Sequence, residues 1–355
     1  MDLRYKEIVE KSVGVILDNQ HASGAYPASP NYAAYNYSWF RDGSFIADAM
    51  SRAGEIESAE KFFDWCSRVI LSKHDSIHNG ETLDARYAYD GSTPLIEWSS
   101  YQLDGYGILL WAIQQHETRH GRSIDRYREL VELVQYYLVL HWNEPSFDWW
   151  EERLGKHAAS LACIYAGLHA FRNPEAVHVK SAIHLDQERT DSSMLACFLF
   201  DAVTADEFSQ SLKNIEAELV SDDGGVYRHP NDTYYGGGEW PILAALLGWC
   251  YVKLGRLDDA QRQLTWCENQ MQSNGWLAEQ TSERMLHPEH FQYWKDKLGQ
   301  PANPLIWSQA MVVSLVSEYE MAGCGSIARS KSEKFPFVFL SDRARQSADQ
   351  NNSSL

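Results

Sequence analysis

The chain has 355 residues, of which 44% are hydrophobic and 13% aromatic, which is enough to bury a large core. Its 31 basic and 49 acidic residues give a formal net charge of −18, which repels the phosphates of nucleic acids and the surfaces of anionic membranes. Charges interrupt the first twenty positions, and no apolar run approaches the roughly 20 residues of a membrane span. We therefore expect a cytoplasmic protein with no nucleic-acid partner and no membrane contact.

The six cysteines are scattered along the chain without a CxxC pair, and most lie among apolar positions with helical spacing. This pattern favours reduced core residues over disulfides or a metal site. They are Cys66, Cys163, Cys197, Cys250, Cys267 and Cys324.

Apolar residues recur with helical period along most of the chain, whereas the alternation typical of strands is scarce. Two clear examples are the apolar positions within 62–70 and within 257–271. An all-helical fold is therefore expected. Further helices are predicted near 3–18, 43–53, 104–117, 126–141, 157–172, 191–203, 206–220, 238–254 and 306–322.

Segments 52–66 and 253–267 resemble each other: in each, a helix is expected to end at a glycine and a new helix with an acidic first turn to follow at once. The two glycines, Gly54 and Gly255, lie 201 residues apart, which corresponds to about four helical hairpins of roughly fifty residues each. The spacing suits a ring of about six hairpins. The alternative is two unrelated joints that share the same turn chemistry.

Long segments rich in glycine, proline, asparagine and aromatic residues separate the helices, and loops of such length are usually functional. They are 19–42, 73–103, 142–156, 221–238 and 272–305. After Gly323 the helical pattern fails, so we expect one catalytic domain over 1–325 and a polar, poorly ordered tail over 326–355.

Carboxylates in two of these loops are candidates for acid and base chemistry. Glu151 and Glu152 directly follow two tryptophans, and an acid packed against apolar rings holds its proton to a higher pH. Glu279 lies near Trp276, far along the chain, and hydrolysis of a glycosidic bond needs a second carboxylate on the opposite side of the sugar. Taken singly, each could instead be an ordinary surface glutamate.

Arg41 and Asp42 follow Tyr35, Tyr37 and Trp39 in the first of the long loops. Fixed polar groups beside aromatic faces are typical of sugar sites, because the polar groups bind hydroxyls and the rings cover the apolar faces of the sugar. The alternative is a structural ion pair at the start of a helix. Loops 97–107 and 224–240 repeat the mixture, and thirteen tryptophans and nineteen tyrosines exceed the needs of a core.

Signals for metals and cofactors are weaker. The pairs His287 with His290 and His116 with His120 are interpreted as surface residues, and the sequence has no GxSxG, GxGxxG or Walker motif. We expect neither a metal nor a cofactor.

Five loops, in order, carry motifs that resemble those of the glucoamylases and related bacterial enzymes, glycoside hydrolase family 15. The resemblance extends over about 35–308 and implies an (α/α)6 barrel, a toroid of helical hairpins with its pocket at one end. The matching residues are Tyr35 to Asp42; Trp98, Gln102, Asp104 and Gly105; Asp148 to Glu152; Tyr227, Arg228, Pro230, Asp232, Tyr234, Tyr235 and Trp240; and Glu279, Gln280, Trp307 and Ser308.

The resemblance also assigns roles by position. Glu151 matches the general acid and Glu279 the general base; Arg41 and Asp42 match residues that hold the terminal glucose, and Arg228 matches an arginine near the cleaved bond. The remaining substrate-binding positions that it implies are Tyr35, Trp39, Trp98, Gln102, Trp150, Glu152, Tyr234 and Trp307.

His229 and Asn231 depart from the fungal pattern, which has an aromatic and an acidic residue there, so the site beyond the terminal glucose is expected to differ. The predicted activity is an inverting, exo-acting hydrolysis that releases β-glucose from short gluco-oligosaccharides such as isomaltose, maltose or dextrin fragments, with the sugar and water as the partners. A trehalase of the same fold, a disaccharide phosphorylase and a catalytically silent sugar-binding protein are the alternatives. The oligomeric state is left open.

Overall fold

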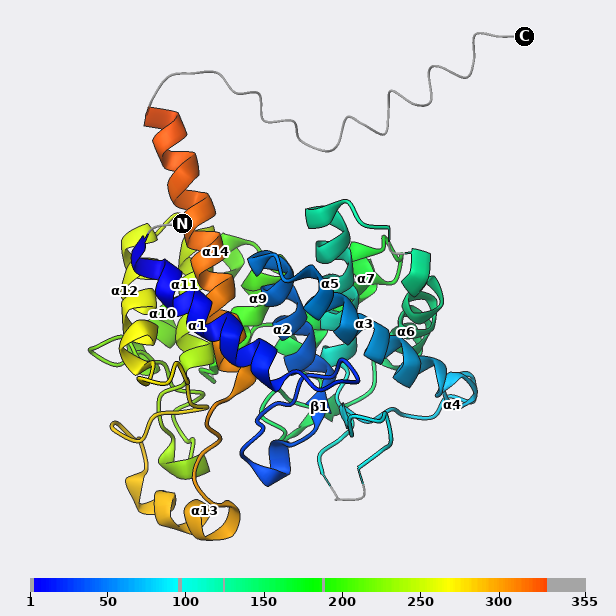
Figure 1. Ribbon diagram of the computed structural model, residues 1–355, viewed down its shortest axis with the longest axis horizontal. Helices are drawn as coiled ribbons and strands as arrows, with labels where there is room; N and C mark the ends of the chain where they lie inside the picture. Colours follow the sequence, from blue (N-terminus) through cyan, green and yellow to red (C-terminus); the bar gives the residue numbers. More distant parts are fainter. Residues whose placement is uncertain (1–2, 95–97, 124, 187–188, 331–355) are drawn as a thin grey trace. The chain divides into compact units, whose positions relative to one another are not determined.

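The computed structural model describes residues 3–94, 98–123, 125–186 and 189–330, with side chains described as far as Gly323. This part of the chain is mostly helical, as the apolar periodicity predicts (Figure 1). Contacts group Met1–Glu320 into one compact unit, and a second unit begins at Met321.

The core of the first unit is a ring of inner helices that are buried on almost every side. Residues 241–252 of one inner helix and 159–168 of another are all buried, as expected for helices that are apolar all round. Successive members of the ring pack against each other, and the last one contacts both the fifth, where Leu315 lies against Gly248, and the first, where Trp307 stacks on Phe45. The inner helices are α2 (Phe40–Ala53), α5 (Asp104–His120), α7 (Ala158–Ala170), α9 (Leu195–Leu199), α11 (Pro241–Lys253) and α14 (Ile306–Ser330).

A second set of helices surrounds this ring, and each packs on an inner neighbour through one apolar face. Inner and outer helices alternate along the chain, and Tyr5 of the first outer helix contacts Tyr319 of α14, with ring centroids 5.8 Å apart. The fold is therefore the (α/α)6 barrel expected from the sequence. The outer helices are α1 (Leu3–Asn19), α3 (Ile56–Leu71), α6 (Arg128–His141), α8 (Ala176–Ser181), α10 (Ala205–Glu218) and α12 (Leu257–Gln270).

The two similar segments, 52–66 and 253–267, belong to equivalent hairpins of the ring. Gly54 ends α2 with a φ of 88°, and Gly255 lies between α11 and α12 with a φ of 74°. In the alternating order α2 is the first inner helix of these hairpins and α11 is the fifth. The two copies are thus four hairpins apart, as their spacing predicts.

Two inner helices approach each other through glycine. A Cβ on Gly107 of α5 would lie 2.3 Å from the carbonyl oxygen of Cys163, and one on Gly167 of α7 would lie 2.4 Å from that of Gly107. Because no side chain fits between the two backbones, these glycines allow α5 and α7 to pack directly.

Several predicted boundaries differ from the structure. The helix expected at 191–203 is a 3-10 turn, η3 (Ser192–Met194), followed by the short α9. The last helix continues to Ser330 instead of ending near 322, so 326–330 are helical, whereas the rest of the predicted tail, 331–355, lies outside the described residues. Two segments expected to be loops contain helices, α4 (His74–His78) and α13 (Phe291–Leu298).

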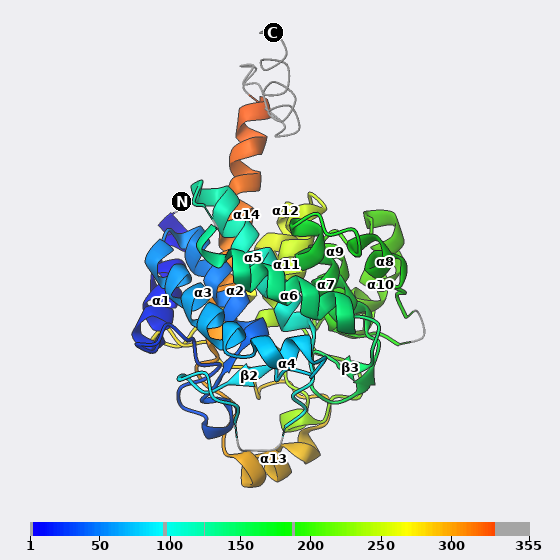
Figure 2. The same cartoon turned by 90° about the vertical axis from the view of Figure 1, so that its right-hand side faces the viewer.

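Short strands and 3-10 turns hold the loops at the end of the barrel where the inner helices begin (Figures 1 and 2). Strand β1 (Ser38–Trp39) pairs antiparallel with β2 (Arg86–Tyr87), and β3 (Ser146–Phe147) with β4 (Leu154–Gly155). Because β1 leads into α2 and β4 precedes α7, these pairs position the residues at the starts of inner helices. The remaining 3-10 turns are η1 (Ala33–Tyr35), η2 (Asp125–Tyr127), η4 (Tyr234–Gly236) and η5 (Pro288–His290).

The cysteines whose side chains are described, Cys66, Cys163, Cys197, Cys250 and Cys267, are free and buried, whereas the side chain of Cys324 lies outside the described part. Across the described ranges, no helix combines the length and apolar character needed to cross a membrane.

Candidate active site

A cavity of about 880 Å³ opens at the end of the barrel where the inner helices begin, and residues of all the long loops line it. Both candidate carboxylates, Glu151 and Glu279, belong to its wall although they are 128 residues apart in the chain. The loops that the sequence predicts to be functional therefore meet around one space.

Arg41 and Asp42 lie in the first turn of α2 and are almost wholly buried. Arg41 donates from Nη1 to Gln102 Oε1 at 2.8 Å and to Asp104 Oδ2 at 3.0 Å. Burial raises the pKa of Asp42 to about 7, although the neighbouring Arg41 opposes this shift. Arg41 Nε and Asp42 Oδ2 have no hydrogen-bond partner within the described part of the chain and face each other as an ion pair at 3.6 Å.

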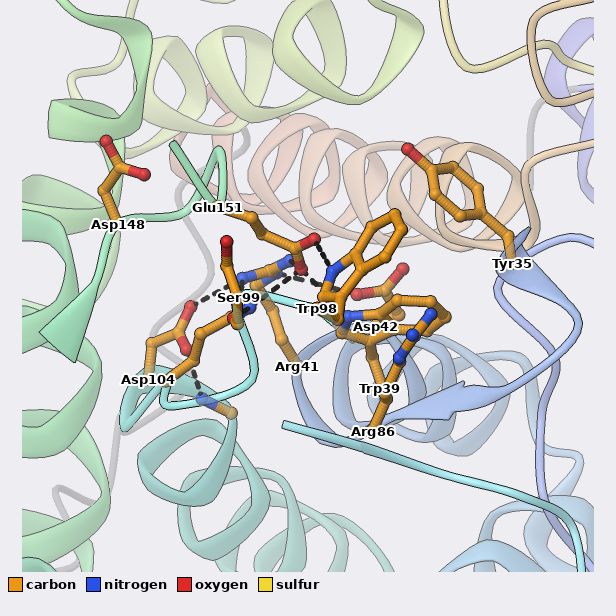
Figure 3. Close-up of polar contacts among 12 residues, drawn as sticks. Tyr35, Trp39, Arg41, Asp42, Arg86, Trp98, Ser99, Asp104, Asp148 and Glu151 are labelled. Carbon is orange, nitrogen blue, oxygen red and sulfur yellow. Dashed lines mark hydrogen bonds and ion pairs between the residues drawn. The ribbon is translucent and has the colours of Figure 1, made fainter. Parts of the chain in front are cut away.

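The carboxylate of Glu151 is held by several donors (Figure 3). Its Oε1 accepts from Trp39 Nε1 at 2.9 Å, from Gln102 Nε2 at 2.9 Å and from Arg41 Nη2 at 3.3 Å. Its Oε2 accepts from Trp98 Nε1. The backbone of Glu151 has a φ of 63°, unusual for a residue other than glycine, and such conformations cluster at functional sites.

Glu279 is 2% exposed and lies in the loop that follows α12. Its backbone N–H donates to Ala302 O at 2.9 Å, and Ser308 Oγ donates to Ala278 O at 2.9 Å, so the loop is attached to the start of α14. Burial raises the pKa of Glu279 to about 8, opposed by Tyr35 and by the positive charge of Arg228. Glu279 Oε2 has no hydrogen-bond partner among the described residues.

Arg228 is the centre of a second buried ion-pair network. Its Nε donates to Asp232 Oδ2 at 2.7 Å, and its Nη2 donates to Asp232 Oδ1 at 2.5 Å and to Glu152 Oε1 at 2.9 Å. Burial would raise the pKa of Glu152, but His229 and Arg228 outweigh it and lower the pKa to about 2. Glu152 is therefore ionised at any working pH.

Glu152, His229 and Asp232 also have ligand atoms within 4.8 Å of one another, a spacing that could suit a metal ion. However, the guanidinium of Arg228 already bonds both carboxylates. The oxygens that a cation would need are engaged by a fixed positive charge, so the group is better described as the support of Arg228.

Aromatic rings form most of the remaining wall. Trp39 and Trp98 meet edge to face at 6.1 Å, and Tyr35 lies edge to face against both. Trp307 stacks on Phe45 at 5.3 Å and lies 5.5 Å from the Arg41 guanidinium. Broad apolar faces beside unpartnered polar atoms are suited to a sugar ring, which presents hydroxyls at its edge and C–H groups on its faces.

The model for glycosyl hydrolases family 15 matches residues 4–172. The isomaltose glucohydrolase of Kribbella flavida is 33% identical over 89% of this chain and 93% of its own length. The chain belongs to glycosyl hydrolase family 15. It is a glycoside hydrolase.

Solved structures of the family agree with this assignment. A wild-type glycosidase with 33% identity superposes with a TM-score of 0.85 over 90% of this chain and 97% of its own. The glucoamylase of Saccharomycopsis fibuligera has 15% identity and a TM-score of 0.70, over 90% of this chain and 95% of its own, and so shows the shared fold alone.

The site residues expected from the family motifs come together around the cavity, with one exception. Gln102 lies behind the wall, where it connects Arg41 to Glu151. The expectation that His116 is a surface residue is wrong, because it is 2% exposed, and its Nδ1 lies 2.9 Å from Ser51 Oγ. His290 is exposed as predicted. The assigned residues that line the cavity are Tyr35, Trp39, Arg41, Asp42, Trp98, Trp150, Glu151, Glu152, Arg228, Tyr234, Glu279 and Trp307, and their roles stay predictions.

Sequence reasoning missed the part of the wall that comes from α13. Trp294, Lys297 and Leu298 line the cavity and share one face of this helix. The spacing of Phe291, Trp294 and Leu298 is helical, and a proline precedes them, so a helix signal was present. The composition of the surrounding segment, 272–305, indicated a loop instead.

Proposed function

We propose that this protein is an exo-acting, inverting α-glucosidase that releases β-glucose from the non-reducing end of short α-glucosides such as isomaltose. The observation that carries the proposal is the meeting of Glu151 and Glu279, from distant loops, at one aromatic cavity. Hydrolysis with inversion uses such a pair, one carboxyl group as acid and the other as base, with room for a water between the base and the sugar.

Arg41 and Asp42 are assigned to the terminal sugar. They are buried at the beginning of α2, where the partial positive charge of the helix N-terminus adds to that of Arg41. Arg41 is held by Gln102 and Asp104, so its orientation is set before a ligand arrives. Preorganised, buried polar groups discriminate well between hydroxyl directions, because a wrong sugar leaves them unpaired.

Glu151 is assigned the role of general acid. Three donors fix its Oε1, whereas Oε2 accepts from Trp98 Nε1 alone among the described residues. Oε2 is thus the oxygen that can carry a proton and donate it to the glycosidic oxygen.

Glu279 is assigned the role of general base. Glu279 lines the cavity, where its carboxylate can accept a proton from an attacking water. Burial disfavours its charge, which strengthens it as a base once it is ionised. Attack by water on one face while Glu151 protonates the leaving oxygen on the other gives the β anomer.

The stereochemical outcome tests the mechanism. Proton NMR during the first turnovers on isomaltose should show β-glucose before mutarotation. Initial formation of α-glucose would show retention and would remove Glu279 from the role of base.

The substrate class is supported by the Kribbella flavida relative, whose name describes hydrolysis of isomaltose. A trehalase of Sulfolobus acidocaldarius is also similar, at 24% identity over 65% of this chain. Initial rates on isomaltose, maltose and trehalose distinguish these activities, and we expect isomaltose to give the highest kcat/KM. A preference for trehalose would overturn the proposed linkage. The cytoplasmic location expected from the sequence stays a prediction.

A further inference from the structure

Helix α13 forms a part of the cavity wall that no motif accounts for. The helix lies between the Glu279 loop and α14, at the end of the barrel that carries the cavity (Figures 1 and 2). Trp294, Lys297 and Leu298 line the cavity, while Tyr293 on another face of the helix is 58% exposed.

The attachment of α13 to the rest of the site is specific. Tyr235 donates from its hydroxyl to Gly299 O at 2.9 Å, and its ring packs against Phe291 at 6.2 Å and Trp294 at 6.3 Å. Tyr32 and Tyr235 share a hydrogen bond between their hydroxyls at 3.1 Å. Tyr235 has a φ of 48°, a costly conformation that the surrounding contacts hold in place. The helix is therefore a fixed wall of the cavity.

The indole of Trp294 also packs against the side chains that surround Arg228. Its ring lies 5.1 Å from that of Tyr234, edge to face, and the Tyr234 hydroxyl is 2.9 Å from that of Tyr35. Tyr234 in turn lies 5.3 Å from the guanidinium of Arg228. A chain of packed side chains thus runs from Trp294 to the residues around Glu279.

The position of α13 indicates which part of a substrate it meets. Arg41, Asp42 and Glu279 are buried, whereas Lys297 is exposed and Trp294 and Leu298 are half-buried. The closed end of the cavity is therefore at the beginning of α2, and α13 stands at its mouth. An exo-acting enzyme places the terminal sugar at the closed end, so the mouth faces the sugar on the leaving-group side.

Resting on the function proposed above, we propose that Trp294 is a substrate-binding residue that holds the sugar on the leaving-group side of the cleaved bond. A flat indole covers the apolar face of a pyranose ring without selecting among its hydroxyls. It therefore adds affinity for the second sugar whether that sugar is linked as in isomaltose or as in maltose. The buried polar groups bind the hydroxyls of the first sugar.

The test compares two substrates that differ only on the leaving-group side. Isomaltose fills both sugar positions, whereas α-glucosyl fluoride fills only the terminal one. The variant Trp294→Ala should lose ~10-fold in kcat/KM on isomaltose, as expected for removal of one aromatic contact, and should keep its rate on α-glucosyl fluoride. Trp294→Phe should recover most of the loss.

Gln292→Ala is the control, because it truncates an exposed side chain of the same helix that does not line the cavity. It should leave both rates unchanged. Equal loss on both substrates in Trp294→Ala, or no loss on either, would overturn the role of Trp294. A wild-type enzyme that hydrolyses no α-linked glucose disaccharide would overturn the proposed function and, with it, this inference.

Discussion

The two ends of the barrel bury charged groups in opposite ways. Where the inner helices end, Asp48 accepts from Arg52 Nε at 2.6 Å and from Arg119 Nη2 at 2.8 Å, and Arg52 Nη1 donates to Glu318 Oε1 at 2.5 Å. Where the inner helices begin, Glu279 Oε2 is buried and lacks a hydrogen-bond partner within the described ranges.

The difference separates structural from functional burial. A buried charge whose bonds are all made within the fold contributes to the specificity or stability of the fold, and breaking it leaves an uncompensated charge. A buried polar atom left unpaired costs free energy in the folded state, and a ligand that bonds to it recovers that cost. The network around Asp48 is of the first kind, and Glu279 Oε2 is of the second.

The largest expected effect is at the cavity end. Glu279→Gln removes the base while keeping the shape of the side chain, so kcat on isomaltose should fall by ~10³-fold. Affinity for glucose, measured as a product-inhibition constant, should change little. Glu283→Gln, an exposed glutamate of the same loop, is the control and should keep the wild-type rate. Normal turnover in Glu279→Gln would exclude it from the mechanism.

The opposite end should respond in stability alone. Asp48→Asn leaves the buried side chain of Arg52 and the half-buried Arg119 without their shared carboxylate, which should lower the free energy of unfolding by ~3 kcal/mol in denaturant titrations. The kcat of the folded variant should be unchanged. Asp64→Asn breaks the exposed pair with Arg126 and should cost less than ~1 kcal/mol. Equal losses in the two variants would mean that burial of the Asp48 network adds nothing.

The two ends should also differ in how stability depends on pH. The pKa of Glu279 is raised to about 8 by burial, so its contribution to stability is complete below its ordinary value of 4.5 and is lost as the pH rises toward 8. Burial alone would raise the pKa of Asp48, but Arg52 and Arg119 outweigh it and lower the value. Its contribution is therefore present above 3.8 and lost as the pH falls.

Free energies of unfolding measured as a function of pH test whether the contributions of Glu279 and Asp48 change in these opposite directions. Relative to the wild type, Glu279→Gln should gain ~1 kcal/mol or more between pH 4.5 and pH 8, because the variant buries no charge. Asp48→Asn should instead approach the wild type as the medium becomes acidic. A constant difference between Glu279→Gln and the wild type over the whole range would show that Glu279 does not titrate abnormally.

Much of the fold and of the candidate site could be predicted from local patterns. Helical periodicity predicted the positions of most helices, and the similar joints at Gly54 and Gly255 predicted the number of hairpins between them. Periodicity and turn chemistry can be recognised locally because each depends on neighbours within a few residues. The residues of the cavity wall were identified because the loops that carry them resemble the motifs of glycoside hydrolase family 15. Helix ends were less predictable: α9 has only five residues, and α14 continues to Ser330.

The sequence by itself determined which helices form and which loops carry chemistry, since periodicity and composition are properties of short segments. Only the tertiary structure decided that Gln102 supports Glu151 from behind, that His116 is buried, and that α13 adds Trp294 to the mouth of the cavity. Those facts depend on contacts between residues far apart in the chain. The packing of hairpins around the ring brings such residues together, and no local pattern records it.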